Sequence, residues 1–173
     1  MREAYKKISS TIEKFILTAG GIALVFFLLI VFSQIILRNF FKMPLIWAND
    51  VSLILFIWSV FLGAACAVKY RKHYMVDVIP HRYEKANAFF DIVADIAGFF
   101  FFYVLIRHGY TYTIMSFSRI STSVSIPQAY FFMVIPISGV AMFMFNIENL
   151  VNDIEKFAAL LKGKSVNKEG AIE

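Results

Sequence analysis

Four long apolar stretches constrain this chain more than any other feature of its sequence. They cover Phe15–Leu37, Ile46–Val68, Ala88–Ile106 and Ile126–Leu150. A helix needs about 20 apolar residues, at about 1.5 Å each, to cross a hydrocarbon core about 30 Å thick. Each stretch comes close to or exceeds that length, and none alternates polar and apolar residues as a membrane strand would. The sequence therefore predicts an all-α integral membrane protein with four transmembrane helices.

The overall composition fits a chain that lies mostly in lipid. Of its 173 residues, 60% are apolar and only 17% are charged, which is too little polar surface to cover a soluble globule of this size. The sequence shows no internal repeat and no low-complexity tract. It predicts a single four-helix membrane domain over residues 1–162 and a cytoplasmic tail over residues 163–173.

The basic residues divide between the two sides of the predicted bundle. Thirteen of the 17 Lys and Arg residues lie before the first span, between the second and third spans, or after the fourth. The other four are Arg38, Lys42, Arg107 and Arg119. Because basic residues concentrate in cytoplasmic segments, both termini are expected in the cytoplasm. Orientation also accounts for the net charge of +5, so we expect no nucleic acid as a partner.

Both ends of the chain carry an apolar stripe at helical spacing outside the spans. At the start, Tyr5, Ile8, Ile12 and Phe15 fall on one helical face, and residues 147–161 show a similar pattern. Amphipathic helices of this kind rest in the headgroup region of a bilayer. We therefore expect both terminal segments at the cytoplasmic interface.

Few ionisable residues fall inside the predicted spans, and three of them are aspartates. Asp50 lies one turn inside the second span, whereas Asp91 and Asp95 share one helical face of the third. A charge at the bilayer centre costs about 2.5–3.5 kcal/mol on insertion scales, so it needs a partner. The pair is interpreted either as a cation or proton site or, as we favour, as carboxylates at helix contacts or the wet inner interface. No Lys or Arg lies at the depth of Asp95, which points to a partner on another polypeptide.

Residues that carry catalysis or hold cofactors are scarce. His73, His81 and His108 all fall at span ends or in loops, which excludes a haem held by two buried histidines, and Cys66 is alone. We expect no enzyme activity, no metal and no cofactor in this chain.

Packing features point to a larger assembly. The aromatic residues, including the run Phe99–Phe102, exceed what a four-helix bundle can bury, so they must face lipid or a larger partner. Pro136 falls in the middle of the fourth span and should bend that helix. Small residues that allow close helix contact occur in every span: Gly20, Gly21, Ser52, Ser59, Gly63, Gly98, Ser138 and Gly139.

Short motifs run through the first half of the chain and return in the fourth span. They cover residues 34–41 (QIILRNFF), 44–50 (PLIWAND), 55–58 (LFIW), 61–65 (FLGAA) and 69–77 (KYRKHYMVD), with echoes at 126–127 (IP) and 135–137 (IPI). In this order and spacing they resemble the small membrane subunit of tripartite ATP-independent periplasmic (TRAP) transporters. That family usually has an acidic pair after the tryptophan, whereas this chain has Asn49 followed by Asp50.

The resemblance implies a four-helix subunit of a bacterial inner membrane, with no transport pathway of its own. It implies docking on a much larger multi-spanning subunit that carries the substrate and sodium sites. It also implies a periplasmic substrate-binding protein and organic-acid substrates such as sialic acid or C4-dicarboxylates.

The resemblance also implies roles for individual residues. Arg38, Trp47 and Asp50 would brace the first two spans or contact the large subunit at the outer side. Asp77 would fix the inner turn after the second span by pairing with a nearby cation. Asp91 and Asp95 are further candidates for contacts with the partner or within the bundle.

Two other functions stay open. A free-standing homodimeric transporter would need an essential carboxylate in mid-membrane, and Asp95 comes closest. A four-helix enzyme acting on lipophilic substrates would need Arg, Tyr and His side chains at one interface. Arg107, His108, Tyr110 and Tyr112 gather in this way, although a helix end explains them equally well.

The predicted orientation can be measured with reporters that work on one side of the membrane. Alkaline phosphatase, which needs disulfides, should be inactive when fused to the C-terminus and active when inserted after Lys42. A fluorescent protein at the C-terminus should fluoresce, because it would fold in the cytoplasm. The opposite pattern at both positions would contradict the assignment.

Overall fold

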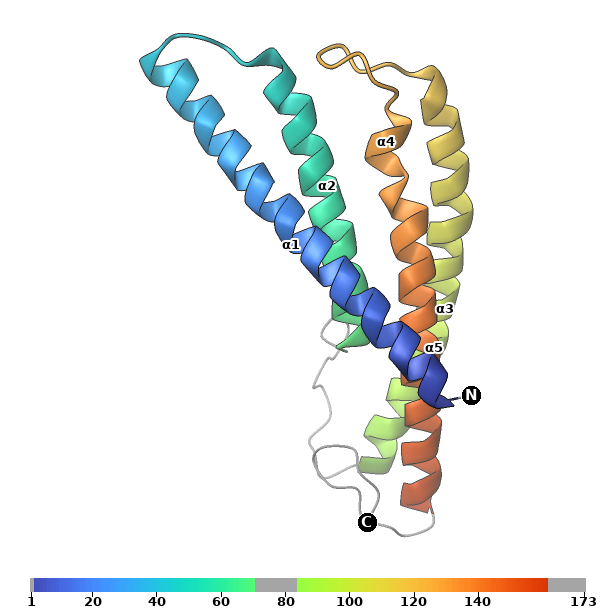
Figure 1. Cartoon of the computed structure of the whole chain (residues 1–173). Coiled ribbons are helices and arrows are strands. Elements are labelled where there is room, and N and C mark those ends of the chain that lie inside the picture. Colours follow the sequence, from blue (N-terminus) through green and yellow to red (C-terminus); the bar gives the residue numbers. More distant parts are fainter. Residues whose placement is uncertain (1, 71–83, 162–173) are drawn as a thin grey trace.

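The computed structural model describes residues 2–70 and 84–161, and nearly all of them are helical (Figure 1). The elements are α1 (Arg2–Phe40), α2 (Ile46–Lys69), α3 (Glu84–Met115), the 3-10 helix η1 (Ser116–Ser118), α4 (Ala129–Phe132) and α5 (Val134–Leu161). Four segments are long and apolar enough to cross a membrane: Lys7–Phe40, Ile46–Lys69, Asn87–Ser118 and Ala129–Leu161. The prediction of an all-α protein with four spanning helices is confirmed. Their orientation stays a prediction, and we call the end of the bundle where α1 begins and α5 ends the inner end, and the opposite end the outer end, after that prediction.

The helices α2 and α5 form the centre of the bundle, and α1 and α3 flank them. α1 packs along α2, α3 packs along α5, and α2 meets α5 between the two pairs. α1 runs obliquely, so that its N-terminal end crosses α5 (Figure 1). The buried core lies where the pairs meet and includes Leu62 and Ala65 of α2, Phe102 of α3, and Met142 and Phe145 of α5. Less of α1 and α3 is buried, and both leave apolar faces on the outside.

The helix α3 continues well past the outer end of the third predicted span. Its 32 residues make a helix about 48 Å long, which exceeds a hydrocarbon core of about 30 Å. Asp91 and Asp95 lie near its N-terminal end, so the apolar part that crosses the core lies toward Met115. Arg107 therefore lies inside the helix, about 12 Å of helix before Met115, rather than at its outer end.

The position of His108 corrects one expectation from the sequence. His108 also lies inside α3, so the prediction that all three histidines fall at span ends or in loops is wrong for this residue. His73 and His81 lie outside the described residues.

The terminal segments continue α1 and α5 as unbroken helices. On the N-terminal stripe, Ile8 and Phe15 are 55% and 74% exposed, as a surface on the headgroups requires. Tyr5 and Ile12 are partly buried and lie on the side of fully buried Ser9. The predicted amphipathic stripe is thus divided between an outward edge and an edge that packs within the chain.

The fourth span is interrupted near its outer end, one turn before Pro136. α4 ends at Phe132 and α5 begins at Val134. Proline has no N–H to bond the carbonyl four residues earlier, and its ring crowds that carbonyl, which here belongs to Phe132. The distortion expected at Pro136 is present, but it lies toward the outer end of the span rather than in its middle.

Glycines mark a close contact between α3 and α5. A Cβ atom added to Gly109 would lie 2.8 Å from Ile135 Cγ2 and 3.2 Å from Pro136 Cδ. A Cβ atom added to Gly139 would lie 2.9 Å from Ile106 Cγ1. These distances are shorter than van der Waals contact, so the two helices approach closely because these positions have no side chain.

Replacing Gly109 with Ala should destabilise the bundle by about 1–3 kcal/mol, because the added methyl group meets the rigid ring of Pro136. Thermal unfolding of the purified protein in detergent measures this effect. Gly63→Ala is the matched control, since a Cβ atom there would meet no atom within 4 Å. Equal melting temperatures for the two variants would contradict the close packing of α3 on α5.

Candidate functional site: polar contacts between the helices

At the outer ends of the helices, Asp50 joins the two helix pairs. Its carboxylate accepts a hydrogen bond from the hydroxyl of Ser121, which lies in the loop between η1 and α4. Backbone bonds close this loop, from Ser121 N–H to the Ile126 carbonyl (2.9 Å) and from Gln128 N–H to the Arg119 carbonyl (2.8 Å). Asp50 therefore connects α2 to the second helix pair, which the sequence did not indicate.

The link between α1 and α2 at this side is made by Asn49. Gln34 Nε2 donates a hydrogen bond to Asn49 Oδ1 at 2.8 Å. Further along α2, Trp58 Nε1 donates to the carbonyl of Tyr130 at 3.0 Å, which ties α2 to α4. Asn49 lies where the TRAP family usually has its first acidic residue. In this chain its neutral side-chain amide accepts a hydrogen bond instead.

Two of the residues assigned to partner contacts are exposed at the same side. Arg38 lies in the last turn of α1, and Trp47 in the first turn of α2 is 48% exposed. Their contact with a large subunit stays a prediction. Asp77 lies outside the described residues.

At the inner ends, an ion pair joins α1 to α2. Lys69 Nζ lies 2.6 Å from Glu13 Oε2, and the two side chains are 16% and 14% exposed. Tyr70 donates its hydroxyl hydrogen to the same carboxylate, and this bond raises the pKa of Tyr70. Lys69 also lies over the ring of Phe145 in α5, 5.2 Å from its centroid, so its charge is placed between three helices.

The first turns of α1 bind α5 directly. Ser9 Oγ donates to Glu148 Oε2 at 2.7 Å, and the Tyr5 hydroxyl donates to the carbonyl of Met144. Burial, together with the nearby Glu148 carboxylate, raises the pKa of Tyr5. These bonds hold the oblique N-terminal part of α1 against the inner half of α5 (Figure 1).

Two buried asparagines of α5 bind the two remaining helices. Asn149 Nδ2 donates to the Val68 carbonyl in the last turn of α2 at 2.9 Å. Asn146 Nδ2 donates to the Asp95 carbonyl in α3 at 2.8 Å. The last carbonyls of a helix have no partner within it, so Asn149 satisfies a group that would be costly to bury unpaired.

Asp91 and Asp95 both lie against α5, as their shared helical face predicts. Asp91 Oδ2 is 3.7 Å from Lys156 Nζ, and Asp95 is 1% exposed. The bonds of Asn146 and Asn149 place Asp95 level with the last turn of α2. Because the chain itself buries this side chain, the structure favours a contact within the bundle over a contact with another polypeptide.

Several of these polar contacts were not expected from the sequence. Asn146, Asn149 and Asp153 recur at helical spacing along α5, and a stripe of this kind could have been read as the counterpart of Asp91 and Asp95. Glu13 and Ser121 offered no such signal, because their partners lie far along the chain and only the fold brings them together.

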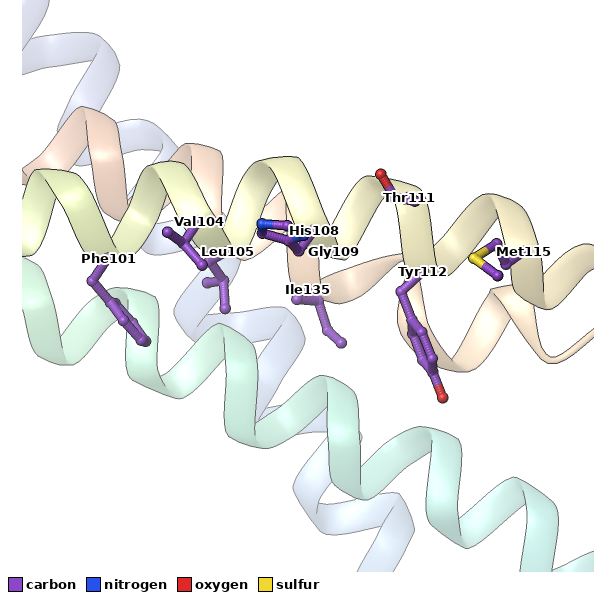
Figure 2. A pocket seen from close by; sticks show the side chains of 9 residues that line it. All are labelled: Phe101, Val104, Leu105, His108, Gly109, Thr111, Tyr112, Met115 and Ile135. Atoms are coloured by element: carbon purple, nitrogen blue, oxygen red, sulfur yellow. The ribbon is translucent and has the colours of Figure 1, made fainter.

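An open hollow of about 480 Å³ lies on α3, beside Ile135 of α5 (Figure 2). Its surface is mostly apolar and is lined by Phe101, Val104, Leu105, His108, Gly109, Thr111, Tyr112, Met115 and Ile135. Within residues 2–70 and 84–161, no three His, Cys, Asp or Glu side chains are grouped so as to hold a metal ion. Among the described residues, the candidate functional features are therefore the polar contacts between helices and the apolar hollow on α3.

Two comparisons with known proteins agree with the resemblance in the motifs. The family model described as "Tripartite ATP-independent periplasmic transporters, DctQ component" matches residues 14–156. The "Sialic acid TRAP transporter permease protein SiaT" of Haemophilus influenzae (strain 86-028NP) is 27% identical over 128 residues. The matched region covers 71% of this chain and 20% of that protein, so the chain spans about a fifth of that relative's length.

Replacing Asn149 with Leu should destabilise the chain by about 1–3 kcal/mol, because it leaves the buried Val68 carbonyl without its donor. Asn49→Leu is the matched control. It also removes a hydrogen bond between a side-chain amide and another helix, but at an exposed site where water replaces the lost partner. Thermal unfolding in detergent compares the two. A larger loss for Asn49→Leu would contradict the importance of the inner contacts.

Proposed function

This chain belongs to the family of DctQ components of tripartite ATP-independent periplasmic transporters, and from this premise we propose that it is the small, non-catalytic subunit of a binding-protein-dependent secondary transporter. The match over residues 14–156 carries the proposal, because it includes all four spanning helices. The subunit works beside a much larger multi-spanning subunit in a bacterial inner membrane.

The length of the relative from Haemophilus influenzae supports the presence of a large partner. The region like this chain makes up 20% of that permease protein, so most of that protein lies outside the match. For this chain we propose that the counterpart of this remainder is the large subunit, and that a periplasmic binding protein delivers the substrate. The substrate is an organic acid of the sialic acid or C4-dicarboxylate class, and sodium ions bound by the large subunit drive its uptake.

The role of the chain itself is mechanical. Its polar side chains are used to fasten helices to one another, from the Glu13–Lys69 ion pair to the Asn149 bond with Val68. A bundle fastened in this way offers the large subunit a steady surface against which to move. The chain enlarges that scaffold and needs no cofactor of its own.

The two alternative functions have less support. A free-standing transporter needs a carboxylate in mid-membrane, but Asp95 lies level with the inner end of α2. A lipid-modifying enzyme needs several polar groups that converge on one site, but the hollow on α3 that His108 and Tyr112 line is mostly apolar.

Co-expression with the large subunit and binding protein of the same organism tests the proposal. The chain should co-purify with the large subunit in mild detergent. Uptake of labelled sialic acid or C4-dicarboxylate is measured in vesicles that hold the complex and a sodium gradient. When this chain is omitted, the rate of uptake should fall by about tenfold or more, and a factor of ten corresponds to about 1.4 kcal/mol. Transport by the chain alone, as a homo-oligomer, would overturn the proposal.

A further inference from the structure

The two flanking helices expose faces of different chemistry. α1 exposes an apolar face that includes Phe26, Leu29 and Phe32, and it has no ionisable residue between Phe15 and Leu37. α3 also exposes large apolar residues, but Arg107 and His108 are exposed among them. A wholly apolar face can contact lipid chains without burying a charge. A face that carries a cation in the hydrocarbon layer cannot do so without a free-energy cost.

Arg107 lies at a depth where its charge needs compensation. We take the end of α2, with which Asp95 lies level, as the inner edge of the apolar layer, and α3 then runs about 30 Å from there to Met115. Arg107 falls within this stretch, and the neighbouring Gly109 packs on Ile135 and Pro136, which lie inside the fourth span. An arginine in this region costs about 2.5–3.5 kcal/mol on insertion scales unless it meets an oppositely charged or polar group.

The bond that Arg107 makes within α3 supplies no negative charge. Its Nη1 donates to Thr111 Oγ1 at 2.9 Å, one turn further along the same helix. The Thr111 hydroxyl in turn bonds the Arg107 carbonyl at 3.1 Å. These bonds hold the guanidinium beside Thr111, at the margin of the hollow on α3, where Arg107 itself is not a lining residue.

The residues that line the hollow form a groove along α3 of the kind in which another helix packs. Phe101, Leu105, His108, Tyr112 and Met115 follow one another at intervals of three or four residues, so they form a stripe along α3 (Figure 2). Gly109 lines the hollow where Ile135 packs closely against α3. A groove lined by a stripe of apolar residues with a small residue in it matches the way membrane helices pack against each other.

We propose that this groove seats a transmembrane helix of the large subunit, which brings an acidic side chain to Arg107 at the edge of the groove. The inference rests on the proposed function, because it assigns the surface through which the small subunit meets its partner. The exposed face of α1 remains in contact with lipid. Charge complementarity selects the occupant, since a lipid chain in the groove would leave the guanidinium without a counter-charge in the hydrocarbon.

Site-specific photo-crosslinking in the intact complex tests this assignment. Benzoylphenylalanine replaces Phe101 in the groove or, as the matched control, Phe26 on α1. The two phenylalanines are 53% and 54% exposed, and each lies about 21 Å of helix from the outer end of its own helix. The probe in place of Phe101 should crosslink to the large subunit, and the probe in place of Phe26 should not.

The outcomes separate this inference from the proposed function. Failure of the unsubstituted chain to co-purify with the large subunit overturns both. Co-purification combined with crosslinks from Phe26 but not from Phe101, or with crosslinks from Phe101 to lipid alone, overturns only the docking surface.

Substitution of Arg107 tests the charge. Arg107→Gln should reduce the amount of large subunit recovered with the chain by about tenfold, whereas Arg107→Lys keeps the charge and should retain most of it. Arg119→Gln, in the outer loop, is the control that removes a charge elsewhere. The chain's own unfolding temperature separates loss of docking from loss of folding. Full recovery with a correctly folded Arg107→Gln variant would contradict the proposed pair.

Discussion

Three residues within one turn of α5 hold this bundle together. Within residues 146–149, Asn146 bonds α3, Glu148 bonds α1 and Asn149 bonds α2. In a bilayer, apolar helices gain little by contacting each other instead of lipid, so close packing and polar contacts determine which helices associate. Each such bond contributes modestly, but here three of them converge on one turn of one helix. The arrangement of the other helices depends on this turn, because it fixes each of them relative to α5.

The same turn lies level with the last turn of α2, and this position changes the interpretation of α3. Hydropathy alone centres the third span on residues 88–106, which includes Asp91 and Asp95 and ends before Arg107. The contacts with α5 place the two aspartates near the inner end of the bundle, and α3 then continues unbroken through Arg107 and His108, which lie within the candidate span Asn87–Ser118. In the sequence, Arg107 and His108 look like residues at the end of a span. In the structure they lie inside α3, where a cationic or polar side chain is unusual.

The sequence predicted the four spans because apolar length is a property of each segment by itself. It also placed Asp91 and Asp95 on one face, since helical periodicity is local. It did not predict the pairing of Asp50 with Ser121, or of Glu13 with Lys69, because those contacts depend on how separate helices and loops meet. Gly109 was overlooked for a related reason: it lay beyond the assumed end of the third span, although it makes one of the closest helix contacts. The family motifs indicated a transporter component but not the surface that we propose for docking, because Arg107 lies outside them.

The inner and outer ends of the bundle are fastened differently, and this difference bears on how a scaffold of this kind would work. At the inner end, bonds from all of α1, α2 and α3 converge on α5 within about one turn. At the outer end, the contacts run through the loop that carries Ser121 and through the exposed Gln34–Asn49 bond. Loop and surface contacts yield more easily than buried hydrogen bonds, so the outer ends of α1 and α2 should adjust to a neighbour more readily than the inner half of the bundle. The groove on α3 lies where Gly109 packs closely on Ile135 and Pro136, so the helix that we propose to dock there would meet a fixed surface.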